Sequence, residues 1–173
     1  MILLFEGWEK VGKTTLARSI KTDLNFQYFR STKQINSNVD LEQAIKYDWR
    51  FMIDFLSQVK TDVCFDRSFI SQYVYSNLFR KDNILKNYDL NEYDIIFKQY
   101  CDSLSLIDYK IIYCYREHYN DEIDDQVDIT KVNEANKLYL DFFNKFVESS
   151  NLICCNYEDG LQYNINKVKQ EIR

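Results

Sequence analysis

Short apolar runs alternate with longer segments of helical periodicity along this chain. The apolar runs are the candidate strands, and they cover residues 2–5, 26–29, 62–65, 109–115 and 152–157. Between them, apolar residues recur at three- and four-residue steps. One predicted helix begins after residue 12, and the others cover about residues 40–59, 69–80, 90–107, 129–146 and 161–172. This alternation predicts a three-layer α/β fold, in which helices cover both faces of a doubly wound parallel sheet of about five strands.

The composition fits one compact domain. The chain has 173 residues, of which 46% are hydrophobic and 28% are charged, so it is long enough to bury a substantial core. It has only three glycines and no proline, which indicates that linkers and low-complexity stretches are absent. We therefore expect residues 1–173 to form a single domain.

Charge and cysteine usage narrow the classes of function. The formal net charge of −5 and the pI near 5.0 argue against nonspecific binding to a nucleic-acid backbone, which uses an extended basic surface. No apolar run approaches the length of a membrane span, so we expect a soluble protein without a membrane partner. Five cysteines, an odd number without CxxC spacing, are typical of a reduced compartment and predict a cytoplasmic location.

Two of the three glycines fall in one loop directly after the first predicted strand. The spacing Gly7-x-x-x-x-Gly12-Lys13-Thr14 is the phosphate-binding pattern (P-loop), in which backbone N–H groups and a helix N-terminus converge on phosphate oxygens. Lys13 would then bridge the β- and γ-phosphates of a nucleoside triphosphate, and the Thr14 hydroxyl would be a Mg²⁺ ligand. The alternative is a chance glycine turn with a lysine nearby. The residues predicted to bind ATP are Gly7, Val11, Gly12, Lys13, Thr14 and Thr15.

Charged residues also follow the second and third predicted strands. Arg30 comes after residues 26–29, and Asp66 and Arg67 come after residues 62–65. Ligands of a parallel α/β sheet gather at the carboxyl ends of its strands, so we expect these residues to lie beside the phosphate loop in one active site. The alternatives are that Asp66 and Arg67 only cap a helix and pair on the surface, and that Arg30 is an ordinary exposed arginine.

Two segments resemble signatures of the thymidylate kinases and their deoxynucleoside kinase relatives. Residues 6–15, EGWEKVGKTT, are similar to the thymidylate kinase loop, where a carboxylate and then often a basic residue follow the first glycine. Residues 66–75, DRSFISQYVY, resemble the family signature DRYxxSxxAY, and the matches are Asp66, Arg67, Ser71 and Tyr75. The resemblance covers about the first 80 residues, and the rest is similar only in architecture. It implies a P-loop nucleotide kinase domain with ATP and Mg²⁺, a small nucleotide substrate and often a homodimer.

The resemblance implies a role for each matching residue. Glu9 would contact the 3′-hydroxyl of the acceptor sugar, and Lys10 would lie over the transferring phosphoryl group. Arg67 and Arg30 would hold the acceptor phosphate, while Asp66 would help to organise Mg²⁺ directly or through water. Phosphoryl transfer needs mostly positioning and positive charge around the moving group. The predicted catalytic residues are therefore Lys10, Lys13 and Arg67.

Tyr47 and Arg50 share one face of the helix predicted at residues 40–59. They could stack on the acceptor base and read its edge, as aromatic and arginine residues do in the related kinases. Arg50 and Asp54 could instead form an ordinary i, i+4 ion pair. The full predicted substrate site consists of Glu9, Arg30, Tyr47, Arg50, Asp66, Arg67, Ser71 and Tyr75.

A lid-like segment is expected near residues 116–128, and it is short and acidic. Many nucleotide kinases close an arginine-bearing lid over the triphosphate, whereas residues 117–128 contain no arginine and Arg116 stands alone before them. Within the thymidylate kinases, arginine-poor lids accompany a basic residue in the phosphate loop, and Lys10 fits that arrangement. The acidic run could also be only a solvated loop.

The function predicted first is transfer of the γ-phosphoryl group of ATP to a deoxynucleoside monophosphate, dTMP or a related pyrimidine. Arg30 at the end of the second strand favours it, because a monophosphate is already anionic whereas a nucleoside hydroxyl needs a base. A deoxynucleoside kinase is the alternative, since Ser68 matches the E-R-S signature of that group. Further alternatives are a kinase acting on a hydroxymethylated base or an end in DNA, and a nucleotide-dependent switch or slow ATPase that uses Asp66.

Overall fold

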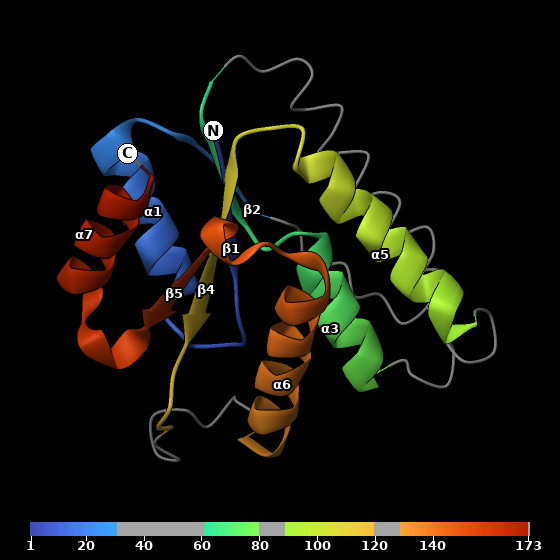
Figure 1. Ribbon diagram of the computed structural model, residues 1–173. Helices are drawn as coiled ribbons and strands as arrows, with labels where there is room; N and C mark the ends of the chain where they lie inside the picture. The colour runs from blue at the N-terminus through green and yellow to red at the C-terminus, as the bar shows by residue number, and fades with distance from the viewer. Residues whose placement is uncertain (31–60, 80–88, 120–128, 173) are drawn as a thin grey trace.

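The computed structural model describes residues 1–30, 61–79, 89–119 and 129–172. Its centre is a five-stranded sheet in which every neighbouring pair is parallel, in the order β2-β3-β1-β4-β5 (Figure 1). The strands are β1 (Ile2–Glu6), β2 (Gln27–Arg30), β3 (Val63–Asp66), β4 (Tyr109–Tyr115) and β5 (Leu152–Asn156). Every residue of β1 and β3 is buried, which explains why both strands are nearly continuous apolar runs.

Helices cover both faces of this sheet. Figure 1 shows α1 and α7 on one face and α3, α5 and α6 on the other. The helices are α1 (Lys13–Leu24), α3 (Phe69–Phe79), α5 (Leu90–Leu104), α6 (Ile129–Phe146) and α7 (Leu161–Glu171), and the 3₁₀ turns η1 (Ser149–Asn151) and η2 (Tyr157–Asp159) flank β5. The predicted three-layer α/β fold is therefore confirmed. Among the described residues, no helix is both long and apolar enough to cross a membrane.

The element boundaries differ from the predicted ones by a few residues. The strands β2 and β3 each lie one residue later than predicted, so that Arg30 and Asp66 are their last residues. The strand β5 ends at Asn156 because its side chain accepts a hydrogen bond from the backbone N–H of Glu158 (3.0 Å) and caps η2. The helix predicted at residues 40–59 lies outside the described residues.

The core between the sheet and α3, α5 and α6 is largely aromatic. Phe69 and Tyr73 of α3 each pack against Phe97 of α5 and Phe142 of α6, with ring centroids 5.0 to 6.4 Å apart. Buried aromatic pairs add to the stability gained from their large apolar area. Because α3 follows closely after the end of β3, this packing also anchors the turn that joins the two elements.

All five cysteines are free thiols. Cys64, Cys101, Cys114 and Cys155 are buried, whereas Cys154 is half-buried. Burial raises the pKa of Cys64, Cys101 and Cys155 to about 12. These thiols therefore carry almost no thiolate near neutral pH, and thiolate is the reactive form.

Candidate active site

The phosphate loop begins where β1 ends and finishes at the N-terminus of α1. Gly7 has φ 139°, and a Cβ there would lie 2.0 Å from the backbone carbonyl oxygen of Cys114 on β4. Gly12 has φ 74°, and a Cβ there would lie 2.8 Å from the ring of Tyr157. Both positions combine a positive φ with a close neighbour, which only glycine tolerates without strain. The backbone therefore needs the two glycines that the motif contains.

Lys13 is the first residue of α1, and its ammonium group lies inside the loop. The residue is only 6% exposed, and Nζ donates a hydrogen bond to the backbone carbonyl of Trp8 (3.2 Å). Burial, assisted by the positive charge of Arg67 and opposed by Asp66, lowers the pKa of Lys13 to about 8. A buried ammonium group at the N-terminus of a helix is suited to contact phosphate oxygens.

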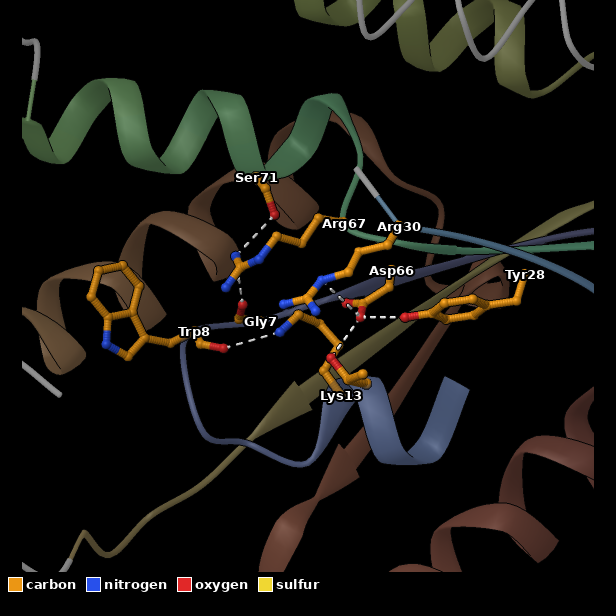
Figure 2. Close-up of polar contacts among 9 residues, drawn as sticks. Gly7, Trp8, Lys13, Tyr28, Arg30, Asp66, Arg67 and Ser71 are labelled. Atoms are coloured by element: carbon orange, nitrogen blue, oxygen red, sulfur yellow. Dashed lines mark hydrogen bonds and ion pairs between the residues drawn. The ribbon is translucent and has the colours of Figure 1, made fainter. Parts of the chain in front are cut away.

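The carboxylate of Asp66, at the end of β3, is contacted by three side chains from two other elements, α1 and β2. Its Oδ2 accepts hydrogen bonds from the hydroxyls of Thr14 (2.6 Å) and Tyr28 (2.9 Å), and it lies 4.0 Å from Nε of Arg30 (Figure 2). Asp66 itself is buried. A hydroxyl and a carboxylate oxygen are thus adjacent at the start of α1, and Mg²⁺ prefers oxygen ligands of this kind. The pair fits a Mg²⁺ ion beside the phosphates.

Arg67 follows β3 in a left-handed conformation, with φ 74°. Its backbone N–H donates a hydrogen bond to the carbonyl of Phe5 (3.0 Å). Its Nη1 donates to the carbonyl of Gly7 (3.4 Å) and to the hydroxyl of Ser71 (3.5 Å). The guanidinium group also lies over the ring of Tyr75, 5.1 Å from the centroid. These contacts hold the charged end of Arg67 beside the phosphate loop, as Figure 2 shows.

Glu6, the last residue of β1, is a fully buried carboxylate at the same edge of the sheet. Its Oε1 accepts hydrogen bonds from the backbone N–H and the hydroxyl of Ser68 (2.7 and 2.6 Å), and its Oε2 accepts one from the hydroxyl of Ser71 (2.5 Å). Burial raises the pKa of Glu6 to about 7, against the opposing effects of the two serines and Arg67. The carboxylate therefore ties β1 to the turn between β3 and α3.

A cavity of about 350 Å³ lies on the other side of the phosphate loop, between α1, β5 and α7. Its mainly apolar lining includes Val11, Gly12, Leu16, Tyr157, Leu161 and Asn164. The guanidinium group of Arg116 lies over the rings of Tyr119 and Tyr157, 4.9 and 5.0 Å from their centroids, so it packs against a residue of the cavity wall. An apolar cavity of this volume can accommodate a flat heterocyclic base.

Most of the predicted site residues meet at the carboxyl edge of the sheet. They are Gly7, Val11, Gly12, Lys13, Thr14, Thr15, Arg30, Asp66 and Arg67. The geometry therefore brings the phosphate loop and the ends of β2 and β3 into one site. Tyr47, Arg50 and the acidic residues 120–128 lie outside the described residues, so their predicted roles stay predictions.

Four other predicted residues lie in or next to this site. Glu9 is partly exposed in the phosphate loop, and Lys10 is exposed there with φ 54°. Ser71 and Tyr75 both belong to α3, and both contact the guanidinium group of Arg67. The Ser71 hydroxyl is buried, so in this structure it supports the arginine from within the protein.

Three residues that the sequence patterns did not single out contact the predicted ones. Glu6 supports the turn that carries Arg67, Tyr28 donates to Asp66, and Tyr157 lies against Gly12. A signal was available for Glu6, because a charged residue at the end of a buried apolar run needs a partner. The two tyrosines carry no comparable signal, since the chain contains fourteen.

Comparisons with known proteins give matches in structure only. No protein-family profile matches the chain, and no curated protein matches its sequence. The YorR protein from Bacillus subtilis, solved in complex with phosphorylated GDP, is similar with a TM-score of 0.64 and 16% identity, over 99% of this chain and 97% of that one. Deoxyadenosine kinase from M. mycoides with bound dATP is similar with a TM-score of 0.57 and 14% identity, over 99% of both chains. With bound dCTP, that kinase gives a TM-score of 0.55 and 20% identity, over 99% of this chain and 98% of that one.

These similarities span whole chains, and at such identities they establish the fold. The protein has the P-loop fold that deoxyadenosine kinase also has, which confirms the predicted fold class. The thymidylate kinase resemblance rests on the sequence signatures alone. A shared fold does not assign a function, which depends on the residues of the site.

Proposed function

We propose that this protein is a nucleotide kinase that transfers the γ-phosphoryl group of ATP to a deoxynucleoside monophosphate, with dTMP or a related pyrimidine as the preferred acceptor. The observation that carries the proposal is the set of cationic side chains around the Asp66 carboxylate and the phosphate loop (Figure 2). Lys13 begins α1 where the phosphate loop finishes, whereas Arg30 ends β2 and Arg67 directly follows β3. The two arginines are therefore available to a second phosphate group.

The donor nucleotide would occupy the phosphate loop and the adjacent cavity. The loop offers its backbone N–H groups and the Lys13 ammonium to the β- and γ-phosphates. Gly12 of the loop and Leu16 of α1 both line the cavity. A base in the cavity can therefore belong to the same nucleotide as phosphates bound in the loop. Its apolar lining would hold the adenine by burial of the ring faces.

Mg²⁺ would bind at the Thr14 hydroxyl and the Asp66 carboxylate, directly or through water. When bound, the ion neutralises charge on the phosphate oxygens and orients them. Thr14 and Asp66 are preorganised for this role, because they already lie 2.6 Å apart. Tyr28 donates to the same carboxylate oxygen and so fixes its orientation.

The acceptor would approach from the side of β2 and β3. An oxygen of its phosphate forms a bond to the γ-phosphorus, the bond from that phosphorus to the β–γ bridging oxygen breaks, and ADP leaves. No residue has to remove a proton, because the acceptor oxygen is already anionic. Arg67 and Arg30 would hold the acceptor phosphate, Lys10 and Lys13 would stabilise the transferring group, and Glu9 would contact the sugar.

A deoxynucleoside kinase is the second candidate. Ser68 after Asp66 and Arg67 favours it, as does the structural similarity to deoxyadenosine kinase. Phosphorylation of a hydroxyl needs a nearby base, whereas β2 ends in Arg30, which is a cation and cannot remove a proton. We therefore place the monophosphate acceptor first.

The experiment that tests the proposal measures ADP formation from Mg-ATP with a panel of acceptors. The panel contains each deoxynucleoside monophosphate, each deoxynucleoside, a DNA oligonucleotide carrying hydroxymethylated bases, and no acceptor. Turnover that requires a monophosphate is the expected result, with the highest kcat/KM for a pyrimidine. Turnover only with a nucleoside or with DNA would replace the proposal by the corresponding kinase, and turnover without any acceptor would make the protein a nucleotide hydrolase.

A further inference from the structure

Glu6 is a charged residue at a position where packing alone would favour an apolar one. It ends a strand whose other residues are apolar, and it is fully buried. Burial raises its pKa to about 7, so an ionised carboxylate is held there against a free-energy penalty. A carboxylate at this position is explained if it makes contacts that an apolar side chain cannot make.

Within the part of the chain that the structure describes, the Glu6 carboxylate accepts three hydrogen bonds, all from the turn that carries Arg67. Two come from Ser68 and one from Ser71, and the Ser68 hydroxyl also accepts a bond from the backbone N–H of Ile70 (3.3 Å). Arg67 directly precedes Ser68 and has φ 74°. A residue other than glycine keeps this conformation only where its surroundings hold it. Glu6 supplies much of that support.

A second set of contacts joins the same turn to the phosphate loop. The hydroxyls of Ser71 and Tyr139 lie 3.2 Å apart, and Tyr139 donates to the carbonyl of Gly7 (3.2 Å). Nη1 of Arg67 donates to that carbonyl and to the Ser71 hydroxyl as well (Figure 2). We call Glu6, Ser68, Ser71 and Tyr139 the buried network. It contacts the guanidinium group and the first glycine of the loop together.

We propose that Glu6 is a positioning residue for the transfer reaction: its carboxylate locks the turn from Ser68 to Ser71 and so fixes the guanidinium group of Arg67 against the phosphate loop. The inference rests on the proposed function, because it takes the ligand of Arg67 to be the acceptor phosphate. Glu6 touches no substrate, and the residues that donate to its carboxylate belong to the turn that carries Arg67. Its effect should therefore fall on the acceptor rather than on ATP.

The kinetic test compares Glu6→Leu and Glu6→Gln with the wild type, using Mg-ATP and the preferred monophosphate. Glu6→Leu removes every acceptor atom, so the KM for the monophosphate should rise about 10-fold while the KM for ATP changes less than about twofold. Glu6→Gln keeps a carbonyl oxygen for Ser68 and should restore part of the loss. A merely structural role would lower the amount of folded enzyme and the apparent kcat, with both KM values unchanged.

Two milder variants keep the test decisive if Glu6→Leu does not fold. Ser71→Ala and Tyr139→Phe each remove one hydroxyl from the buried network, and each should raise the KM for the monophosphate about threefold. The matched controls are Ser76→Ala on α3 and Tyr93→Phe on α5, which alter equally buried residues outside the network. The controls should leave both KM values unchanged.

A measurement without any acceptor separates this inference from the proposed function. In ¹⁵N-labelled protein, the Nε–H proton of Arg67 should exchange with water faster in Glu6→Leu and Ser71→Ala than in the wild type. If exchange rises while the wild type phosphorylates no monophosphate, the proposed function fails and the positioning of Arg67 stands. Unchanged exchange, or KM values in the network variants that equal those of the controls, would overturn the inference.

Discussion

The carboxyl edge of the sheet has two halves with opposite chemistry. The charged half surrounds the end of β3, where Glu6, Asp66 and Arg67 are held by hydrogen bonds from several elements. The apolar half is the cavity between α1, β5 and α7, with Leu16 and Tyr157 in its wall. The phosphate loop separates the two. One half fixes the directions of charged groups, and the other offers shape and apolar surface.

This difference matches two tasks of the proposed reaction. Charge is redistributed on the transferring phosphoryl group, and groups that are oriented beforehand stabilise such charge most effectively. The donor base keeps the same charge throughout, so apolar burial is enough to hold it. We therefore expect substitutions in the charged half to change turnover or acceptor binding, and substitutions in the apolar half to change ATP binding.

The largest effect is expected at Lys13, in the loop between the two halves. Lys13→Ala removes the ammonium group that would contact the transferred phosphate, so kcat should fall about 10³-fold. Steady-state ADP formation measures it, and Lys131→Ala, which removes a lysine of a surface ion pair on α6, is the control. If Lys13→Ala kept more than a tenth of the wild-type kcat, the loop would not hold the transferred group.

Glu6 allows the charged half to be examined without substrate. Its pKa is raised from 4.5 to about 7, mainly by burial. Below pH 4.5 the carboxyl is protonated in both the folded and the unfolded protein. Between pH 4.5 and 7 the folded protein binds more protons, so the free energy of unfolding falls as the pH rises, and above pH 7 the loss is complete.

The wild type should therefore lose about 3 kcal/mol of stability relative to Glu6→Gln across that interval. Urea unfolding of the two proteins at matched pH values measures the difference in their free energies of unfolding. Subtracting one free energy from the other removes the contributions of all other titrating groups. A difference that stays constant between pH 4.5 and 7 would mean that the folded protein does not perturb Glu6.

Arg30 extends the charged half toward solvent, since it is exposed and 4.0 Å from the Asp66 carboxylate. Arg30→Ala should raise the KM for the monophosphate about 10-fold, because one charge-assisted contact is lost, and should leave the KM for ATP nearly unchanged. Initial rates at varied concentrations of each substrate separate the two values. Equal increases in both would assign Arg30 to the triphosphate, and no increase would make it an ordinary surface residue.

The smallest effect is expected in the apolar half. Tyr157→Ala removes part of the cavity wall, so the KM for ATP should rise about threefold while the KM for the monophosphate stays constant. Tyr163→Ala on α7 is the matched control, because both tyrosines are about half exposed and Tyr163 is not among the residues that line the cavity. A rise in the monophosphate KM for Tyr157→Ala would show that the two halves are not independent.

The positions of many site residues could be predicted from the sequence by two rules. One is the spacing of a local motif, and the other is the place where parallel strands end. The glycines, Lys13 and Thr14 are adjacent in sequence and form one recognisable spacing. Arg30 and Asp66 are distant in sequence, but each ends a parallel strand, and the carboxyl ends of parallel strands meet at one edge. The alternation of apolar runs and periodic segments was therefore enough to place them together.

The buried network could not be predicted, because its members meet only through tertiary packing. Glu6 and Ser68 are 62 residues apart, and Tyr139 is 132 residues from Gly7. Glu6 looks like the end of a strand, and Tyr139 is one of fourteen tyrosines. The hydrophobic pattern along the chain predicts which residues of a helix are buried. It does not predict which hydroxyl group donates to which carbonyl.

The distribution of thiols makes the unmodified chain suitable for site-selective fluorescent labelling. Four of the five cysteines are buried, so a maleimide dye should attach to Cys154. Burial also raises the pKa of this thiol, and a mildly alkaline buffer would therefore speed the coupling. Cys154 is adjacent to Cys155, which lines the cavity beside the phosphate loop. Consecutive side chains of a strand point to opposite faces, so a dye on Cys154 would lie away from the cavity and leave it open, in a protein from which no cysteine has to be removed.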